Sequence, residues 1–381
     1  MPAIKDEAFP IGEARKIVAD LLKPKAWIYW TDTLITLTIT YGCIFFIFHQ
    51  ETVMEYDKGI PTDPSQYIPA FFFSWPAILC YVVAGFGLHR AANMIHEVAH
   101  LNATNSLKSY RIAWNFLVGI PAMVPSYFFE YHMDHHNNTI FATGRDGEYL
   151  PIGRGPFFRV FLFLTQIVGQ PILVLFRWFV LTPISFLHPR FRHWVLSTCS
   201  SVVFNHAYRR RISKDAPRKW WAAMDIMCCL RAWLIPGLVV LGALGVSIGT
   251  PLSRIFTILL LALLPLTLHY FRSLTAHHWI LDGRQVSFRA QLLDSVDIVG
   301  NRFFTELLYP VGLRYHALHH MFPTLPYHNL RTAHERLMAQ LPADSVYRDM
   351  VYPSVFSVLK EFFKTVRSIP KQVPSHMSDA V

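Results

Sequence analysis

Three histidine-rich clusters have the spacing that a metal site needs. They are HEVAH (His96 and His100), HMDHH (His132, His135 and His136) and HALHH (His316, His319 and His320). Side chains at positions i, i+3 and i+4 are neighbours on one helix face, so each cluster is expected to direct its imidazoles to a common point. Neutral imidazole is a good ligand for iron or zinc. Eight histidines are more than one ion normally takes, so the count predicts two metal ions.

The first cluster also fits another kind of metal site. HEVAH satisfies the HExxH pattern of zinc proteases, in which the glutamate, here Glu97, acts as general base. Leu281, Asp282 and Gly283 form an LDG, the sequence in which intramembrane zinc proteases carry a third ligand. This alternative leaves both HxxHH clusters without a role. A second alternative is a non-catalytic metal transporter with histidine-rich loops.

With these clusters the chain resembles the membrane fatty acid desaturase family and its related hydroxylases and ketolases. HEVAH stands where that family has its first histidine box, and HMDHH matches the second. HALHH, followed by MFPTLPYHNL, is similar to the third box and the stretch after it. The resemblance implies a ninth metal ligand between the last membrane span and the third box. His277 is the main candidate for it, with His278 and His269 as alternatives.

Carboxylates near the boxes are candidates for a supporting role, because ligand histidines commonly donate their second N–H to such groups. These carboxylates are Glu97, Glu130, Asp134 and Asp146. Apolar residues that flank the boxes are candidates to line a groove for a lipid chain, namely Phe116, Leu117, Val118, Ile120, Phe128 and Phe129. We expect no catalytic side chains beyond the metal ligands.

The chemistry follows from the resemblance and from the nature of a hydrocarbon. An unactivated methylene has no acidic proton and no leaving group, so its reaction needs a strong oxidant. Two Fe²⁺ ions with dioxygen as co-substrate supply one, and the protein orients the chain and excludes side reactions. Loss of a second hydrogen gives an alkene, whereas return of a hydroxyl gives an alcohol. The resemblance favours a fatty-acyl desaturase, with a hydroxylase or ketolase of a lipid or carotenoid as the alternative.

Each turnover needs two electrons from outside the chain. The sequence contains no His-Pro-Gly-Gly haem signature, and its five cysteines lack the spacing of an iron–sulfur cluster. A separate donor, of ferredoxin or cytochrome b5 type, is therefore expected. The basic segment 189–219 is a candidate to dock an acidic donor, although anionic lipid explains its charge equally well. The basic residues follow no single recognition element, so we expect no nucleic acid partner.

Composition places these clusters in a membrane protein. The chain of 381 residues is 52% apolar and only 16% charged, whereas soluble domains carry about 25% charged residues. Since about 20 apolar residues cross a bilayer, four segments are expected to span it. They run roughly over 30–48, 67–88, 232–248 and 255–270, and the last two are joined by a tight turn at 249–253.

The number of membrane crossings between the second and third boxes decides how to interpret a fifth apolar stretch, 157–187. The second and third boxes can meet only if an even number of crossings separates them. The segment 189–219 carries eight basic residues against the single Asp215, so it should lie in the cytoplasm. We therefore expect 157–187 to dip into the membrane and return, or to lie along the interface.

The predicted fold is an all-α integral membrane protein. It has four transmembrane helices, an interfacial or re-entrant helical stretch, and a cytoplasmic helical cap that carries the histidine boxes. One desaturase-like domain is expected over residues 1–371, with a disordered tail at 372–381. Both termini and the active site are expected on the cytoplasmic side of a multi-pass membrane protein.

Overall fold

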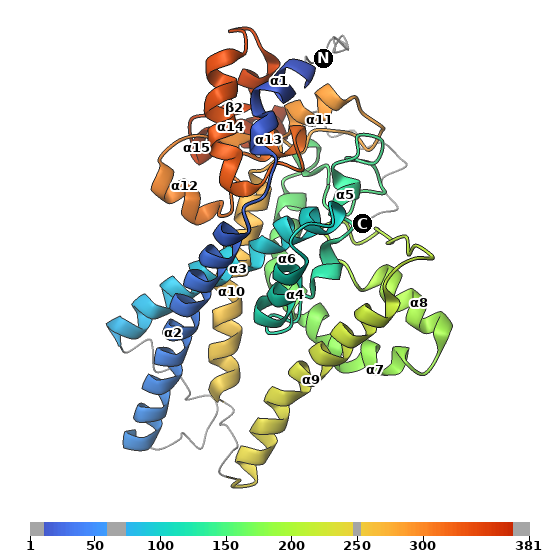
Figure 1. Ribbon diagram of the computed structural model, residues 1–381. Helices are drawn as coiled ribbons and strands as arrows, with labels where there is room; N and C mark the ends of the chain where they lie inside the picture. Colours follow the sequence, from blue (N-terminus) through green and yellow to red (C-terminus); the bar gives the residue numbers. More distant parts are fainter. Residues whose placement is uncertain (1–10, 59–73, 247–252, 369–381) are drawn as a thin grey trace.

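The computed structural model describes residues 11–58, 74–246 and 253–368, and the chain there is mostly helical. The predicted disordered tail, part of the predicted second span, and the turn before α10 lie outside these residues. Long helices extend to one end of the molecule, and short helices form a cap at the other end (Figure 1). The short helices that precede and form the cap are α1 (Ile11–Val18), α11 (Phe288–Asp294), α12 (Arg302–Leu308), α13 (His316–Met321), α14 (Tyr327–Gln340) and α15 (Val355–Ser368).

Among the described residues, five helices are long and apolar enough to cross a membrane. Side chains that would meet lipid remain exposed on them, for example Phe45, Ile172 and Leu230, each more than 60% accessible. A helix suits this setting because it satisfies its own backbone hydrogen bonds. The chain is therefore a multi-pass, mostly helical membrane protein, as expected. The long elements are α2 (Ala26–Lys58), α3 (Trp75–Ala103), α6 (Phe158–Phe176), α9 (Arg218–Ala243) and α10 (Ser253–Leu274).

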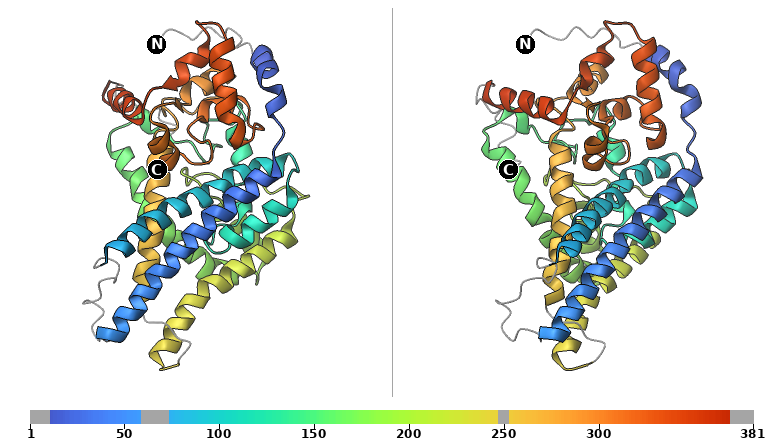
Figure 2. Two further views of the ribbon diagram at one scale, coloured as in Figure 1. Left: turned by 60° about the vertical axis from the view of Figure 1, so that its left-hand side comes forward. Right: turned by 90° about the vertical axis from the view of Figure 1, so that its left-hand side faces the viewer.

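Helices α2, α3 and α10 form the frame that leads to the cap. Helix α3 packs against both α2 and α10, and Figure 2 shows these helices extending toward the same end as α9. Arg90 of α3 binds Asp32 of α2 through Nε at 2.8 Å and Nη2 at 2.5 Å. Tyr327, the first residue of α14, donates its hydroxyl proton to the same Asp32 at 2.7 Å. This carboxylate therefore ties the cap to the two membrane helices.

Helix α6 continues through a π-helical turn (Arg177–Leu181) into α7 (Thr182–Ser185), and α8 (Pro189–Thr198) follows. Both flanks of this segment contact the histidine-bearing part of the chain. Before it, the backbone N–H of Gly153 donates to the carbonyl oxygen of Trp279 at 3.1 Å. After it, the Asn205 side chain donates to the carbonyl oxygen of Asp146 at 3.1 Å.

A buried charge cluster holds this segment against α9. Asp225 is fully buried and pairs with Arg177 at 3.2 Å and with Arg192 at 2.5 Å. Tyr127 donates its hydroxyl proton to the same carboxylate. The cluster thereby links α6 and α8 to α9 near its cap-side end.

Several boundaries differ from the prediction. Helix α9 begins at Arg218 rather than near Ala232, because Trp221, Met224 and Asp225 are buried on its inner face. The segment 189–219 is not only a loop, since Pro189 starts α8 at the position where proline favours helix initiation. Helix α3 runs on beyond the predicted span and carries the first histidine box itself.

The remaining elements are short. A two-stranded parallel pair, β1 (Asp297–Ile298) with β2 (Val351–Tyr352), brings the segment before α12 next to the segment before α15. Between α3 and α6 lie α4 (Lys108–Trp114), a π-helical turn (Asn115–Gly119), two 3₁₀ turns (Ser126–Phe129 and Ile152–Arg154) and α5 (His132–His135). Further 3₁₀ turns cover Ala19–Leu21 and Val346–Met350.

Candidate metal centre

Four separate segments bring nine histidines together between the membrane helices and the cap. Helix α3 supplies two histidines and α13 supplies three. The short helix α5 with its C-cap residue supplies three more, and the segment after α10 supplies His277. Eight of the nine are at most 6% exposed, and His136 is half-buried. The structure therefore brings the eight box histidines and His277, the main candidate for the ninth ligand, together in one buried region.

The nine side chains form two groups, and within each group the candidate ligand atoms all lie within 4.8 Å of one another. We call them the first group and the second group. The first group contains His96, His100, His132, His136 and His319, and the second contains His135, His277, His316 and His320.

The boxes are divided between the groups, so the expectation that each box points to one place is wrong. Histidines four residues apart stay together, as His132 with His136 and His316 with His320. The histidine at the intervening i+3 position, His135 or His319, belongs to the opposite group. An α-helix turns about 100° per residue, so i+4 lies about 40° from i while i+3 lies about 60° away on the other side. The i, i+3, i+4 spacing therefore serves two sites at once.

Carboxylates fix the ring orientation of several histidines. His132 Nδ1 lies 2.6 Å from Glu148 Oε1, and His135 Nδ1 lies 2.9 Å from Asp146 Oδ2. His277 Nδ1 lies 3.4 Å from a carboxylate oxygen of Asp294. When these Nδ1 atoms carry the proton and donate it, each Nε2 keeps a free lone pair. The arrangement is the one in which a carboxylate orients a metal-binding imidazole.

The Nε2 atoms with free lone pairs lie close together, and the distances between them show whether a metal ion fits. Nε2 of His136 lies 2.9 Å from Nε2 of His132, and Nε2 of His316 lies 2.9 Å from Nε2 of His277. Nitrogens bound to one ion at about 2.1 Å and at right angles lie about 3 Å apart. Both ring nitrogens of His96 and His100 are buried and have no hydrogen-bond partner. Since buried polar atoms are normally paired, this donor set fits metal ions.

The protonation states agree with this role. Burial, with a further contribution from neighbouring imidazoles, holds the pKa of His132, His136 and His319 well below the usual value. Burial also lowers the pKa of His135, but the neighbouring carboxylates, Asp146 foremost, more than offset this and raise it overall. Burial raises the pKa of Glu148 to about 8. A cation bound to His132 favours the ionised form of that carboxylate.

Of the carboxylates singled out in the sequence, Asp146 is the one that hydrogen-bonds a histidine of the centre among the described residues. Asp146 binds His135, whereas Glu130 pairs with Arg210 at 2.8 Å. Glu97 accepts a hydrogen bond from Tyr29 at 2.6 Å, and its other oxygen lies 3.8 Å from His96.

Three supporting residues had no distinguishing sequence signal. They are Glu148, Asp294 and Gln291, whose Nε2 donates to the carbonyl oxygens of His135 and His136 at 3.3 and 3.2 Å. Glu148 follows Asp146 by two residues. The backbone N–H of Glu148 donates to Asp146 Oδ1 at 2.9 Å, so the two carboxylates are positioned together.

The structure separates the three candidates for the ninth ligand. His277 lies in the second group, where its Nε2 is 3.3 Å from Nε2 of His135. Nε2 of His278 instead lies 3.2 Å from the hydroxyl of Tyr352. His269 packs against Phe204 and Tyr270. Of the three, His277 is the one placed with the box histidines.

The protease arrangement has no counterpart in this geometry. Asp282 of the LDG forms ion pairs with Arg154 and Arg284 and belongs to neither histidine group. Glu97 is engaged by Tyr29 of α2 and by the backbone N–H of Tyr327 in the cap. These two hydrogen bonds link Glu97 of α3 to α2 and to the cap.

Aromatic rings cover part of the centre. Phe129 stacks on His132 with ring centroids 4.7 Å apart. Phe141 contacts His135, with centroids 5.0 Å apart, and also packs against His277 and His320 of the same group. Of the residues proposed to line a groove, Val118, Phe128 and Phe129 are buried while Phe116 is 49% exposed.

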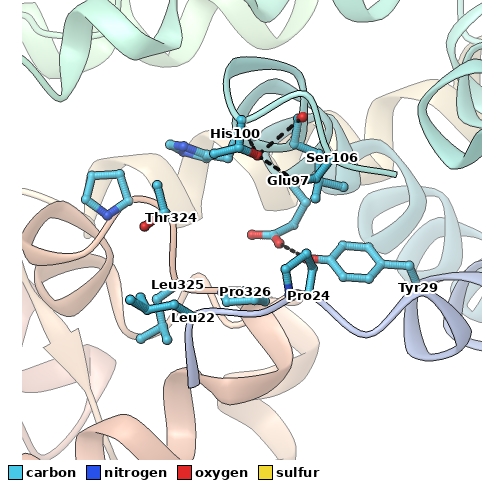
Figure 3. Close-up of a pocket in the computed structure, with 12 residues that line it drawn as sticks. Leu22, Pro24, Tyr29, Glu97, His100, Ser106, Thr324, Leu325 and Pro326 are labelled. Atoms are coloured by element: carbon cyan, nitrogen blue, oxygen red, sulfur yellow. Dashed lines mark hydrogen bonds between the residues drawn. The ribbon is translucent and has the colours of Figure 1, made fainter. Parts of the chain in front are cut away.

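A small pocket reaches the first group from one side (Figure 3). Glu97, His100, Thr104 and Ser106 supply polar groups to it, and residues 323–326 cover it. Figure 3 shows the Glu97 carboxylate directed toward Tyr29, with His100 on the neighbouring wall. Its volume of about 80 Å³ holds a few water molecules, whereas sites for larger ligands measure about 300 Å³ or more. The pocket is therefore too small for a lipid chain.

Comparison with known proteins agrees with this geometry. The model of the fatty acid desaturase family matches residues 73–352, a range that contains all nine histidines. The chain is also 34% identical to a ceramide hydroxylase of Caulobacter vibrioides (strain NA1000 / CB15N). That similarity extends over 356 residues and covers 93% of each chain.

Proposed function

This chain belongs to the fatty acid desaturase family of membrane oxidoreductases, and on that premise we propose that it hydroxylates a ceramide-like lipid at a two-iron centre. The observation that carries the proposal is the pair of adjacent histidine groups, each made of buried nitrogen donors with free lone pairs. The preference for hydroxylation rests on similarity along nearly the whole chain to a ceramide hydroxylase.

The proposed ligands are the nine histidines. The first group holds one iron ion and the second group holds the other. Bound there, the two ions together with dioxygen would supply an oxidant strong enough to remove a hydrogen atom from an unactivated methylene. In the balanced reaction, R–H, dioxygen, two electrons and two protons give R–OH and water.

The protein side chains prepare this centre. Glu148 and Asp146 keep the proton on Nδ1 of His132 and His135, so that each Nε2 remains a donor to metal. Phe129 and Phe141 cover the imidazoles and exclude bulk water from the reacting carbon. Exclusion of water matters because it prevents the oxidant from being consumed in side reactions.

Desaturation is the second candidate. The family to which the chain belongs is named for it, and the same centre performs it if a second hydrogen leaves the neighbouring carbon before oxygen returns. The balanced reaction then yields an alkene and two water molecules. How the lipid lies against the two groups decides between the outcomes.

We further propose four membrane crossings, with α6 to α8 entering and leaving on one side and the centre facing the cytoplasm. The contacts of Gly153 with Trp279 and of Asn205 with Asp146 support this, because both flanks of the segment then lie at the centre. The exposed basic residues Arg209, Arg211 and Lys214 suit the cytoplasmic side.

The electrons come from a separate carrier in this proposal, a ferredoxin or a cytochrome b5. The exposed basic residues after α8 suit an acidic carrier, and anionic lipid remains the other partner for them.

Residues 1–371 act as one desaturase-like domain.

Lipid analysis tests the proposal. Lipids from cells that express the chain are compared by mass spectrometry with lipids from cells that express the His319→Ala variant. We expect a new lipid with one added oxygen atom, present with the native chain and absent with the variant. A lipid that instead lacks two hydrogen atoms would assign desaturation. No lipid difference, together with bound zinc and no iron, would overturn both candidates.

A further inference from the structure

Two neighbouring phenylalanines of the cap are exposed as a pair. Phe303 and Phe304 belong to α12, and 68% and 69% of their respective surfaces are accessible. Their rings contact each other edge to face, with centroids 5.5 Å apart. The next residue, Thr305, is buried, so α12 directs the two rings away from the rest of the protein. Since large apolar side chains are unfavourable in water, the pair indicates a contact outside the chain.

The inner side of α12 fixes its place beside the membrane helices. Helix α12 packs against α3 and α10, at the side of the cap next to these long helices (Figure 1). The carbonyl oxygen of Leu308, the last residue of α12, lies 3.0 Å from Nε2 of His89 on α3. The hydroxyl of Tyr309 shares a hydrogen bond with Thr275, which directly follows α10. Both contacts join α12 to helices that span the membrane.

The end of α10 marks the membrane boundary at this place. Helix α10 has 22 residues, so it is about 33 Å long at 1.5 Å per residue. The hydrocarbon core of a bilayer is about 30 Å thick. A helix of this length that spans the core therefore ends near the head groups, where Thr275 then lies. Because Tyr309 contacts Thr275, the end of α12 lies at the same depth.

The lipid-facing surface of the spans continues up to α12. Phe271, in the last turn of α10, is still exposed, so the apolar surface of that helix extends to the level of Thr275. Arg302, which precedes the two phenylalanines, is exposed as well. The charge of Glu306 is compensated by Arg314 at 3.6 Å. Helices in a membrane interface combine apolar rings with basic residues that attract anionic head groups.

We propose that α12 anchors the cap to the membrane, with the rings of Phe303 and Phe304 inserted among the lipids of the adjoining leaflet. The partner of this surface is the bilayer itself, with acyl chains around the rings and anionic head groups near Arg302. This inference goes beyond the proposed function and needs only a membrane-spanning chain. It holds for a hydroxylase and for a desaturase alike.

The anchor also sets the depth of the metal centre. His96 follows His89 by seven residues on α3, which places it about 10 Å farther along the helix. With Leu308 and His89 at the level of the head groups, the first histidine group lies on the cap side of the hydrocarbon core. A lipid substrate would then reach the ions through the head-group region, at the boundary where α12 lies.

Photocrosslinking in vesicles identifies what α12 contacts. The light-activated residue p-benzoylphenylalanine replaces Phe303, Phe45 or Ala339 in the full chain, which is reconstituted in vesicles of phosphatidylethanolamine and phosphatidylglycerol. Phe45 is exposed on the membrane helix α2 and is the positive control. Ala339 is exposed near the end of α14, about 18 Å along that helix from Tyr327. It is the negative control, because Tyr327 is the end of α14 that contacts α2.

Mass spectrometry of the digested protein gives the result. We expect phospholipid adducts on the peptides with the probe at 303 and at 45, and none on the peptide with the probe at 339. Adducts at 45 without any at 303, or equal adducts at 303 and 339, would overturn the inference. A crosslink from position 303 to a second copy of the chain would overturn it too, and would assign the two rings to a dimer interface.

Hydrogen exchange measures whether the lipid contact stabilises α12. The double variant Phe303→Ser, Phe304→Ser should fold, because neither ring is buried within the protein. In vesicles its α12 amides should exchange about tenfold faster or more than those of the native chain, since burying one phenylalanine side chain is worth at least about that factor. The double variant Phe303→Leu, Phe304→Leu keeps apolar side chains and should exchange nearly as the native chain does. Equal exchange in the native chain and the serine variant would contradict the anchor.

Discussion

At the scale of single residues, the sequence predicted which histidines come together but not how they divide. Clusters of type HxxHH predict metal ligands because few other patterns bring three imidazoles to one helix face. The division into two groups depends on which side of a helix each neighbouring element approaches, and the sequence does not contain that information. The supporting carboxylates Glu148 and Asp294 were missed for the same reason. Each reaches its histidine through the path of a loop rather than by its spacing from a box.

Substitution of adjacent histidines tests the ninth ligand. His277→Ala should lower the iron content of the purified protein and abolish oxygenation, because it removes a donor of the second group. His278→Ala should retain both, since His278 contacts Tyr352 outside the groups. Iron is measured by emission spectrometry and product by lipid analysis. Equal loss in the two variants would remove His277 from the ligand set.

The supporting carboxylates should matter nearly as much as the ligands. Asp146→Asn removes the charge that holds the His135 ring, and a loss of this kind typically lowers metal affinity about 10- to 100-fold. Titration of metal-free protein with Co²⁺, followed by its visible absorption, measures the change. Asp134→Asn is the matched control, because among the described residues the ion pairs of the centre's histidines involve other carboxylates and not that of Asp134.

Glu97 distinguishes the oxygenase from the protease alternative. Glu97→Gln should keep its hydrogen bond with Tyr29 and leave oxygenation within about fivefold of the native rate, since an exchanged hydrogen bond is worth about 1 kcal/mol and Glu97 makes its hydrogen bonds with Tyr29 and Tyr327. A zinc protease would lose its general base and all of its activity. Rates of lipid product formation and of peptide cleavage are compared in the same preparation.

At the scale of elements, long apolar runs gave reliable predictions and helix ends did not. The spans within α2, α3 and α10 follow directly from about 20 apolar residues in a row. The start of α9 escaped prediction because the charged residues Asp225 and Arg231 interrupt the apolar run before Ala232. In the structure Asp225 of this stretch is buried by ion pairs with Arg177 and Arg192. Ion pairs between distant segments cannot be predicted from the local sequence.

Breaking that cluster should loosen the α6 to α9 region. Asp225→Leu leaves the buried Arg177 without its carboxylate partner, and removal of one member of a buried pair costs about 3–5 kcal/mol. The apparent Tm in detergent should fall, while Asp215→Leu, at an exposed position, should leave it unchanged. An unchanged Tm in Asp225→Leu would show that the cluster contributes little to stability.

The path of α6 to α8 can be tested by chemical labelling. Cysteines placed at Arg145 and Lys214, both exposed, lie before α6 and after α8. An impermeant maleimide should label both in inside-out vesicles and neither in right-side-out vesicles, because the segment returns to the side it left. The parent protein supplies the background from its own cysteines. Labelling of the two positions from opposite sides would mean that the segment crosses.

At the scale of the whole molecule, the buried histidines make the protein sensitive to acid. Burial holds the pKa of His316, His319 and His320 well below the usual value, which is about 6.5 in an unfolded chain. Their contribution to stability is therefore complete above about pH 6.5 and is lost as the pH falls, because the unfolded chain then binds more protons.

Metal should leave over the same range, since only neutral imidazole binds it. Iron content and Tm, measured in detergent between about pH 8 and about pH 5, should decline together. A Tm that falls while iron stays bound would contradict this account. Metal-free protein is the control, and its Tm should be lower throughout because it lacks the bound ions.

The division of the boxes between the two groups has a consequence for how the enzyme becomes active. His135 and His136 are neighbours in the chain yet serve different groups, and α13 also serves both. An ion that enters either group therefore immobilises the helices that form the other and lowers the entropy cost of the second binding step. Loading should be cooperative, with a Hill coefficient above one and no stable half-filled species. Cells short of iron would then hold a mixture of empty and complete enzyme, and activity would follow iron supply as a threshold.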